Sequence, residues 1–328
     1  MGTYADNGRE ELAAWESIDT LLTVEMRPRG LPRGYISAFY DAVRNGGEPL
    51  VYRIARELRA LEPSRFAIFT GVVLPPHLEL GEVDGFPGAA ILARALGRLG
   101  HAVELVVEPP QVDVARLLCE IAGAEQVEVL DGVTGRASDV QSYVEDLGAA
   151  IAIEKIGRNG QGIRHSVLGT PFTTPTEHVD DYFEAMLARG RLTVGIGDGG
   201  NEIGFGAAAD RVKAILGTRS HCRCGCADGI VTATATRYLL PCAISNYGAY
   251  ALATALAILT AELDLCPEPG LVGTLLAESV AAGLLDGGTL DPTFVGDDGV
   301  PVEAVKAVAQ LLTTIAHQDL AVPAERPF

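Results

Sequence analysis

Lysine is scarce in this chain of 328 residues, and basic residues in general are fewer than acidic ones. Lys155, Lys213 and Lys306 are the only lysines among 25 basic residues, and 43 acidic residues give a formal net charge of −18. Phosphate backbones are bound by clustered Lys and Arg, so this charge argues against a nucleic-acid partner. Lys155 nevertheless stands within a polar motif, which makes it a candidate functional residue.

Long apolar runs are missing as well. No stretch of about 20 apolar residues occurs, so we predict no membrane span. The first residues, MGTYAD, are acidic and lack the apolar core of a signal peptide, which predicts a cytoplasmic protein. A P-loop motif of the type GxxxxGK[ST] is also absent. These absences favour a cytoplasmic protein that acts on a small molecule.

Six cysteines in such a chain are expected to be reduced thiols. Cys222, Cys224 and Cys226 suggest a metal site at first sight. However, their spacing is not the C-x2-C pair of zinc modules, and no second half follows downstream. We therefore favour alternating residues in or beside a strand over structural zinc. Cys242 and Cys266 lie in apolar context and are predicted to be core residues.

The order of predicted elements indicates the fold class. Residues 1–63 read as a helical N-terminal segment, and residues 64–328 read as one α/β catalytic domain in which strands alternate with helices. Such alternation predicts a mostly parallel sheet with helices on both faces, in three layers. The predicted helices are 10–22, 32–44, 48–61, 88–99, 112–122, 138–147, 177–188, 206–216, 249–263, 271–284 and 301–316. The predicted strands are 66–73, 102–107, 126–130, 149–153, 191–194 and 229–233.

The most informative stretch is residues 195–206, GIGDGGNEIGFG, which follows the apolar run of a predicted strand. Its six glycines permit tight turns around three polar side chains, Asp198, Asn201 and Glu202. The spacing also fits the GxGxxG dinucleotide fingerprint, but Asp198 would repel a pyrophosphate and no acidic residue stands about 20 residues further on. A purely structural glycine turn would not explain the polar side chains. We therefore interpret the segment as the floor of an active site at the carboxyl end of a strand.

Three further polar clusters fall where predicted strands end. They lie within residues 82–89, 154–162 and 245–248, each with adjoining glycines. Loops at one edge of a parallel sheet converge, so all four clusters can share one site. Their polar side chains are Glu82, Asp84, Glu154, Lys155, Arg158, Asn159, Ser245, Asn246 and Tyr247.

The residue types in these clusters suggest what they bind. Carboxylates at this density favour a cation, which is either a divalent metal such as Mg²⁺ or Mn²⁺ or a substrate ammonium. Arg158 offers a bidentate fork for a carboxylate, and the backbone N–H groups near Gly199 and Gly200 can hold another anion. A ligand that carries both an amine and carboxylates, such as an acidic amino acid, matches both halves. No cofactor is certain from the sequence, and a homo-oligomer is possible.

With these motifs in view, the chain resembles the carboxy-terminal domain of the D-glutamate cyclase family. The matching segments are 82–89, 153–162, 196–206 and 245–252, together with Asp228, in the family's order and over roughly residues 65–265. Departures include Phe86 in a Thr-Asp-Gly-Pro-Pro-Gly motif, Tyr247 where the family has Trp, and Lys155 where Arg is common. Animal members carry another domain ahead of this one, which we expect to be absent here.

The resemblance implies cyclisation of D-glutamate to 5-oxo-D-proline with loss of water, so a lyase. Asp198 or Glu202 would act as the base, and Lys155 and Arg158 would bind carboxylate oxygens. Asn201 and Asn246 would orient the substrate, beside Asn159, Ser245, Tyr247, Gly199 and Gly200. Possible metal ligands are Glu82, Asp84, Glu154 and Asp228. Two alternatives stay open: a metal-dependent hydrolase or lyase acting on another small acid, and a non-catalytic metabolite-binding module.

Overall fold

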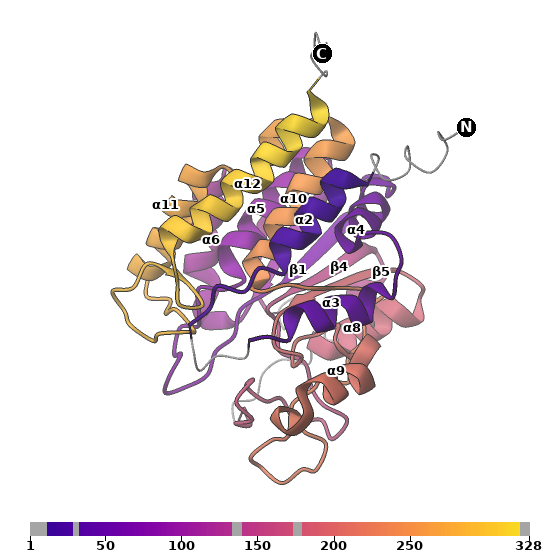
Figure 1. Ribbon diagram of the computed structural model, residues 1–328, viewed down its shortest axis with the longest axis vertical. Helices are drawn as coiled ribbons and strands as arrows, with labels where there is room; N and C mark the ends of the chain where they lie inside the picture. The colour runs from indigo at the N-terminus through magenta and orange to yellow at the C-terminus, as the bar shows by residue number, and fades with distance from the viewer. Residues whose placement is uncertain (1–11, 29–32, 133–139, 173–178, 322–328) are drawn as a thin grey trace, which may run out of the picture.

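The structure, a computed structural model, describes residues 12–28, 33–132, 140–172 and 179–321. Its centre is a six-stranded parallel sheet in the order β3-β2-β1-β4-β5-β6 (Figure 1). The strands are β1 (Arg65–Phe69), β2 (Ala102–Val107), β3 (Glu128–Asp131), β4 (Leu147–Ile153), β5 (Leu192–Gly197) and β6 (Tyr238–Pro241). The predicted parallel α/β sheet is therefore confirmed.

The central strands are apolar on both faces, because each face is covered by helices. In β1, Phe66 and Ile68 point into one hydrophobic cluster, whereas Ala67 and Phe69 point into another. This alternation is the two-residue period of a strand. The sheet is thus the middle layer of three, as the sequence predicts.

Most helices cover the first face. There α5 (Phe86–Arg98) and α10 (Ser245–Thr260) pack against each other, with α6 (Val112–Ala122), α11 (Pro269–Ala281) and α12 (Val302–Leu320) beside them. Figure 1 shows α5, α6, α10 and α12 on one side of β1, β4 and β5, with α8 (Val179–Ala188) on the other. The second face is covered by α8 and the short α7 (Val140–Val144).

The alanine-rich helix α10 lies at the centre of this arrangement. From Ser245 to Ile258 every residue is buried. Small side chains allow α5 to come close, and a Cβ added at Gly88 would lie 2.8 Å from the Cβ of Ala249. The helix is therefore a core element that covers the sheet.

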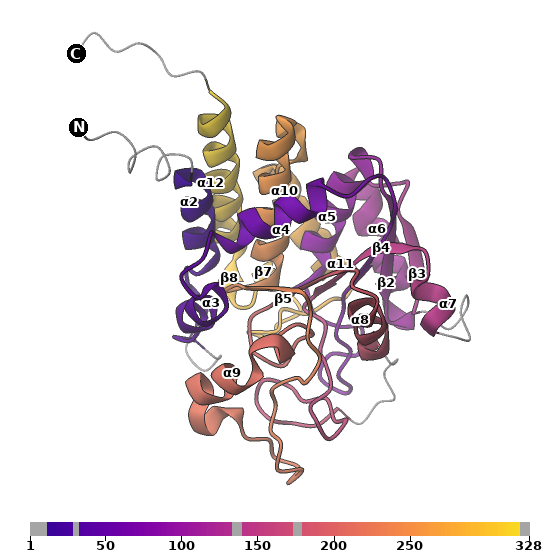
Figure 2. The ribbon, with the colours of Figure 1, turned by 90° about the vertical axis from the view of Figure 1, so that its right-hand side faces the viewer.

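The helices of the N-terminal segment pack on the same core. They are α2 (Ala13–Leu22), α3 (Ile36–Arg44) and α4 (Leu50–Arg59), and Figure 2 shows α2 beside α12 and α4 crossing α10. Trp15, Ile18 and Ile54 belong to the hydrophobic cluster that contains α10 and α12. The boundary at residues 63 and 64 stays a prediction.

Several predicted elements differ from the structure. Residues 229–233 were expected to form a strand, but they form a loop, and the last strand is β6 instead. Ile230 and Val231 are apolar because they pack against α3 and α9 (Ala209–Leu216). The strand β6 was not predicted, because Pro241 at its end argues against a strand in a prediction from residue propensities. The hairpin of β7 (Gly296–Asp297) and β8 (Val300–Pro301) was not predicted.

The expectation that the clustered cysteines alternate in or beside a strand is also wrong. Residues 221–230 form an irregular loop, with positive φ angles of 73° at Gly225, 63° at Ala227 and 83° at Gly229. Along a strand, every second residue is separated by about 7 Å. The Sγ atoms of Cys222 and Cys224 lie only 3.5 Å apart, because the chain turns back on itself.

Other differences concern element ends. The predicted helices 10–22, 32–44, 138–147 and 177–188 begin at residues outside the described ones, and the described parts are α2, α3, α7 and α8. Cys242 and Cys266 are buried core residues, as predicted. Within the described residues, none of the helices combines the length and apolarity that crossing a membrane requires.

Candidate active site

The sheet order has its topological switch point between β1 and β4. The chain proceeds from β1 to one edge of the sheet and from β4 to the other, so the loops after these two strands diverge. Ligands of open α/β sheets bind outside the carboxyl ends of the strands at such a point. Asp84 comes after β1, Glu154 directly after β4, and Asp198 and Glu202 after β5. These carboxylates define the candidate active site, called here the acidic site.

The glycine-rich loop after β5 folds around its own glutamate. Glu202 accepts backbone N–H groups from Gly199 at 2.8 Å and Gly200 at 2.9 Å. The predicted anion site at these two glycines is therefore filled by a carboxylate of the same loop. Glycine is required at Gly195, where a Cβ would lie 2.3 Å from the carbonyl oxygen of Ile203. The loop is thus fixed by its own sequence before any ligand binds.

The amino end of α10 joins two of the predicted clusters. Asp84 accepts the backbone N–H groups of Ser245 at 2.9 Å and Asn246 at 2.8 Å, which satisfies donors at the start of the helix. Ser245 Oγ donates to Glu154 at 2.5 Å. The Asn246 side chain donates to Asp297 at 2.8 Å. Three of the predicted clusters therefore meet at one buried point, together with Asp297, which the sequence did not predict.

Burial dominates the electrostatics of this site. It raises the pKa of Asp198 to about 7, although Arg27 acts in the opposite direction. Burial and the neighbouring Asp198 raise the pKa of Asp298 to about 7 as well. Burial also raises the pKa values of Asp84 and Glu154 well above the usual range, with further contributions from neighbouring carboxylates. The acidic site can therefore hold protons at neutral pH and exchange them.

Arg27 is a residue of the acidic site that the sequence did not predict. Its Nη1 donates to Asp198 at 2.6 Å and to Asp298 at 3.3 Å, and its side chain is 3% exposed. The other edge of the guanidinium, Nε and Nη2, is buried and has no hydrogen-bond partner among the described residues. Nothing in the sequence around Arg27 signals this role, because it follows a helix far from every glycine-rich motif.

Asp297 and Asp298 were missed too, although their sequence carries a signal. They stand between Gly296 and Gly299 in the β7–β8 hairpin. Acidic residues between glycines are also the pattern by which the loop after β5 was predicted to form part of the site. Asp297 Oδ1 is buried and has no partner among the described residues.

The side chains of Lys155 and Arg158, which were predicted to bind substrate carboxylates, point away from the acidic site. Lys155 Nζ donates to Glu108 at 2.6 Å and to the carbonyl oxygen of Gly71 at 2.9 Å, in a neighbouring small pocket that Arg164 also lines. Arg158 pairs with Asp181 at 2.7 Å and Glu184 at 2.8 Å, and its side chain is 27% exposed. Neither side chain contacts the acidic site. Their assignment to substrate carboxylates has no support in this geometry.

Three predicted polar residues hold loops together. Asp228 pairs with Lys213 at 2.8 Å and accepts the Gly160 N–H at 2.5 Å, apart from the other carboxylates. The Asn159 side chain donates to the Gly229 carbonyl at 2.8 Å, and the Asn201 side chain donates to the His165 carbonyl at 2.9 Å.

The remaining predicted residues lie at the margin of the site. Tyr247 is buried, and its hydroxyl has no partner among the described residues. Glu82 is half-buried near Gly287, where an added Cβ would lie 2.5 Å from the glutamate Oε2.

The donor set of the acidic site fits a hard divalent cation. Asp84, Asp198 and Asp298 each offer an oxygen, and Glu154, Asp198 and Glu202 form a second such group, with the oxygens of each group within 4.8 Å of one another. Mg²⁺ and Mn²⁺ prefer carboxylate oxygens. Arg27 faces the same oxygens, so a metal and the guanidinium would share them. Of the predicted metal ligands, Asp84 and Glu154 belong to these groups, whereas Glu82 and Asp228 do not.

Comparison with known proteins agrees with the resemblance seen in the motifs. Residues 50–313 match the family described as D-glutamate cyclase-like, C-terminal. Human D-glutamate cyclase, mitochondrial, is 29% identical over 192 residues, which cover 54% of this chain and 30% of the human protein. The chain thus spans less than a third of that relative's length. The match over most of the chain, together with the fold and the converging motifs, shows that it belongs to the D-glutamate cyclase-like C-terminal family.

Proposed function

We propose that the acidic site cyclises D-glutamate to 5-oxo-D-proline with release of water. The observation that carries the proposal is a buried cluster of carboxylates around one arginine, with the Asp198 pKa raised to about 7. Membership of the family supports it, as does the name of the human relative. The enzyme would be a lyase.

Recognition would use opposite charges on the substrate. The ammonium group would contact carboxylates such as Asp198 and Glu154. A substrate carboxylate would take the free edge of Arg27, whose Nε and Nη2 present two parallel donors. This revises the expectation that Lys155 and Arg158 bind the substrate, because both are paired elsewhere. An acidic amino acid satisfies both halves of the site.

The chemistry then needs a base and an anchored electrophile. Asp198 takes a proton from the ammonium, and a pKa of about 7 suits a base that works near neutral pH. The freed amine attacks the γ-carboxyl carbon and the C–N bond forms. The nitrogen then loses a second proton, and both protons are transferred through Asp198 to the carboxyl oxygen whose C–O bond breaks, so that this oxygen leaves as water. The Arg27 guanidinium stabilises the oxyanion of the intermediate. Because the reaction is intramolecular, positioning alone provides much of the rate gain.

A divalent cation can take part in the same site. Asp84, Asp198 and Asp298 would hold it, as would Glu154 with Glu202. Bound there, a metal would polarise a carboxyl oxygen of the substrate.

The density of oxygen ligands also favours a second candidate. A metal-dependent hydrolase or lyase that acts on another small carboxylic or amino acid would use the same groups. It differs from the cyclase in substrate and in an absolute need for metal. A non-catalytic binding module would instead show thermal stabilisation by ligand without turnover.

The test is incubation of the purified protein with D- and L-glutamate, with and without EDTA, followed by chiral chromatography for 5-oxoproline. Product from D-glutamate alone is expected, and the Asp198→Asn variant should lose at least about 100-fold in kcat. No product from either enantiomer with Mg²⁺ or Mn²⁺ supplied would reject the cyclase. Unchanged turnover in Asp198→Asn would reject the assigned base.

Two further predictions accompany this function. A cytoplasmic location is proposed from the sequence, whereas the human relative is named as mitochondrial. Self-association into a homo-oligomer is open to a measurement of mass in solution.

A further inference from the structure

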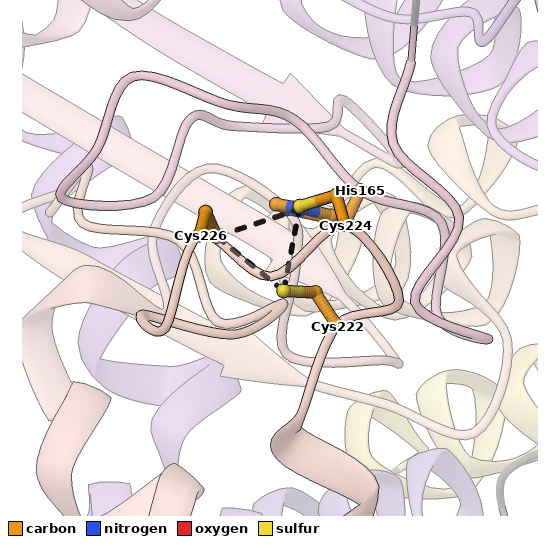
Figure 3. A group of neighbouring side chains, drawn as sticks. All are labelled: His165, Cys222, Cys224 and Cys226. Atoms are coloured by element: carbon orange, nitrogen blue, oxygen red, sulfur yellow. Dashed lines mark hydrogen bonds between the residues drawn. The ribbon is translucent and has the colours of Figure 1, made fainter.

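We propose that His165, Cys222, Cys224 and Cys226 bind one structural zinc ion (Figure 3). The histidine comes from the loop after β4, and the three cysteines come from the loop after η3 (Gly217–Ser220). Figure 3 shows the four side chains gathered where the two loops meet, and their ligand atoms all lie within 4.8 Å of one another. The proposal is independent of the cyclase activity, because none of these residues belongs to the acidic site.

The distances match a tetrahedral zinc site. Zinc bonds of about 2.3 Å to sulfur and 2.0–2.1 Å to nitrogen place tetrahedral ligand atoms about 3.5–3.8 Å apart. Cys222 Sγ lies 3.4 Å from Cys226 Sγ and 3.5 Å from Cys224 Sγ. His165 Nε2 lies 3.1 Å from Cys224 Sγ and 4.0 Å from Cys226 Sγ. A metal at the centre requires shifts of only a few tenths of an ångström.

The two loops are built to bring these ligands together. The Arg223 N–H donates to the Gly169 carbonyl at 2.8 Å, beside His165. Gly169 has a φ of 84°, and a Cβ there would lie 3.0 Å from the His221 carbonyl oxygen. The close approach therefore depends on glycine. Gly229, with a φ of 83°, makes a similar approach to the Ser220 carbonyl oxygen.

The ligand types select zinc and a structural role. Three thiolates and one imidazole are soft to intermediate donors, unlike the hard oxygens of the acidic site. Four protein ligands close the coordination sphere, which is the arrangement of structural rather than catalytic zinc sites. The spacing of the cysteines does not predict the site, because the fourth ligand, His165, lies 57 residues before Cys222 and not downstream.

The zinc would stabilise loops that support the active site. The Asn159 side chain donates to Cys226 Sγ at 3.3 Å and also to the Gly229 carbonyl. The Asn201 side chain, in the glycine-rich loop, donates to the carbonyl oxygen of His165. Both asparagines were predicted to bind substrate. Here Asn159 joins the two zinc loops to each other, and Asn201 joins the loop of His165 to the glycine-rich loop.

Two other uses of these thiols make different predictions. A disulfide needs sulfurs about 2.05 Å apart, so it would require the loop to move and would leave one thiol unpaired. A Cys224–His165 nucleophile pair needs an accessible thiolate. Zinc binding, in contrast, protects all three thiols at once.

The first experiment uses the wild-type protein and measures metal rather than activity. After expression with zinc and dialysis against EDTA, elemental analysis should find about one zinc per chain. Replacement by Co²⁺ should give a thiolate-to-cobalt charge-transfer band, which carboxylate ligands do not give. Protein without zinc, with no such band after cobalt addition and with all three thiols reactive, would overturn the proposal.

Variants then assign the ligands. Cys226→Ser should lose the tightly held zinc and the charge-transfer band, and its Tm should fall by several degrees. Cys119→Ala, a buried cysteine of α6 outside the cluster, is the matched control and should keep one zinc. Retention of zinc by Cys226→Ser would contradict the ligand set. If Cys226→Ser does not fold, the wild-type stoichiometry and cobalt spectrum still decide.

Discussion

Arg27 illustrates how much one buried residue can control in this molecule. It contacts Asp198 and Asp298, whose charges would otherwise face each other across the site without compensation. Buried charges are tolerated when they are paired. Removal of one partner leaves the other charge buried without compensation, which costs free energy of folding. The guanidinium therefore affects both the protonation of Asp198 and the binding of an acidic ligand.

We expect Arg27→Gln to lower kcat/KM for D-glutamate by about 10²–10³-fold, the cost of losing one oxyanion donor. The pH at which activity reaches half its maximum should also rise, because Arg27 holds the pKa of Asp198 down. Steady-state kinetics across pH 5–9 checks both effects. Arg56→Gln, which removes an exposed pair with Glu48, is the control and should leave the profile unchanged. A pH profile of Arg27→Gln identical to that of the wild type would contradict this role.

Individual site residues were predictable where glycine marked them. Asp84, Glu154, Asp198 and Glu202 stand within three residues of a glycine in segments that follow strands, and the structure brings all four together. The direction of a long side chain was not predictable. Lys155 follows Glu154 directly, yet its amine points into another pocket and pairs with Glu108. A partner that lies 47 residues away along the chain leaves no trace in the local pattern.

Among the elements, α5 and α10 position the site through their close contact. The Gly88 N–H donates to the Asn246 side chain at 2.6 Å, next to the residues that bind Asp84. Interhelical contact at this distance is possible because residues 88 and 249 are glycine and alanine. The amino ends of α5 and α10 are therefore held together next to Asp84, so a shift of either helix would move this carboxylate.

Gly88→Ala should destabilise the protein by about 1–3 kcal/mol, the usual effect of overpacking a core. The added Cβ would lie 2.7 Å from Asn246 Oδ1 and 2.8 Å from the Ala249 Cβ, so one helix must shift. Gly273→Ala in α11 is the matched control, because its Cβ meets only the flexible Lys306 side chain and alanine favours a helix. Equilibrium denaturation of both variants measures the difference. Equal stability of Gly88→Ala and the wild type would show that the helices have room to adjust.

The elements themselves were largely predictable from periodicity. Residues 102–107 and 112–122 form β2 and α6 with the predicted bounds. Failures occurred where tertiary contacts override local pattern. Ile230 and Val231 read as a strand but pack a loop against helices, and β6 is short and ends in proline. The β7–β8 hairpin, with two residues in each strand, is too short to produce any periodicity.

The whole molecule carries its negative charge inside as well as outside, which makes its stability depend on pH. Asp198 and Asp298 have pKa values raised from 3.8 to about 7, and Asp19 to about 6, with burial as the leading cause. Between pH 4 and 7 the folded protein therefore binds more protons than the unfolded chain. Stability that these groups contribute is present at low pH and is lost as the pH rises through 7.

We therefore expect the Tm, measured in EDTA by differential scanning fluorimetry, to fall by at least about 4 °C between pH 5.5 and 8. Millimolar Mg²⁺ or Mn²⁺ should raise the Tm more at pH 8 than at pH 5.5, because ionised carboxylates bind the cation. The Asp198→Asn variant provides the control, since it removes one of the titrating groups and should weaken both effects. A Tm that rises with pH in the wild type, with no response to either cation, would contradict the charge balance described here.

Arg27 lies outside the part of the chain that matches the family. The similarity to the family begins at residue 50, whereas the guanidinium inside the acidic site comes from the segment before α3. The helix that precedes Arg27, α2, is held beside the end of β6, since the Ala243 N–H donates to the Leu22 carbonyl at 2.7 Å. The family match therefore covers the carboxylates of the site but not the residue that supplies the opposing charge. A protein cut at the edge of the recognisable homology would keep every acid of the site and lose its counter-ion.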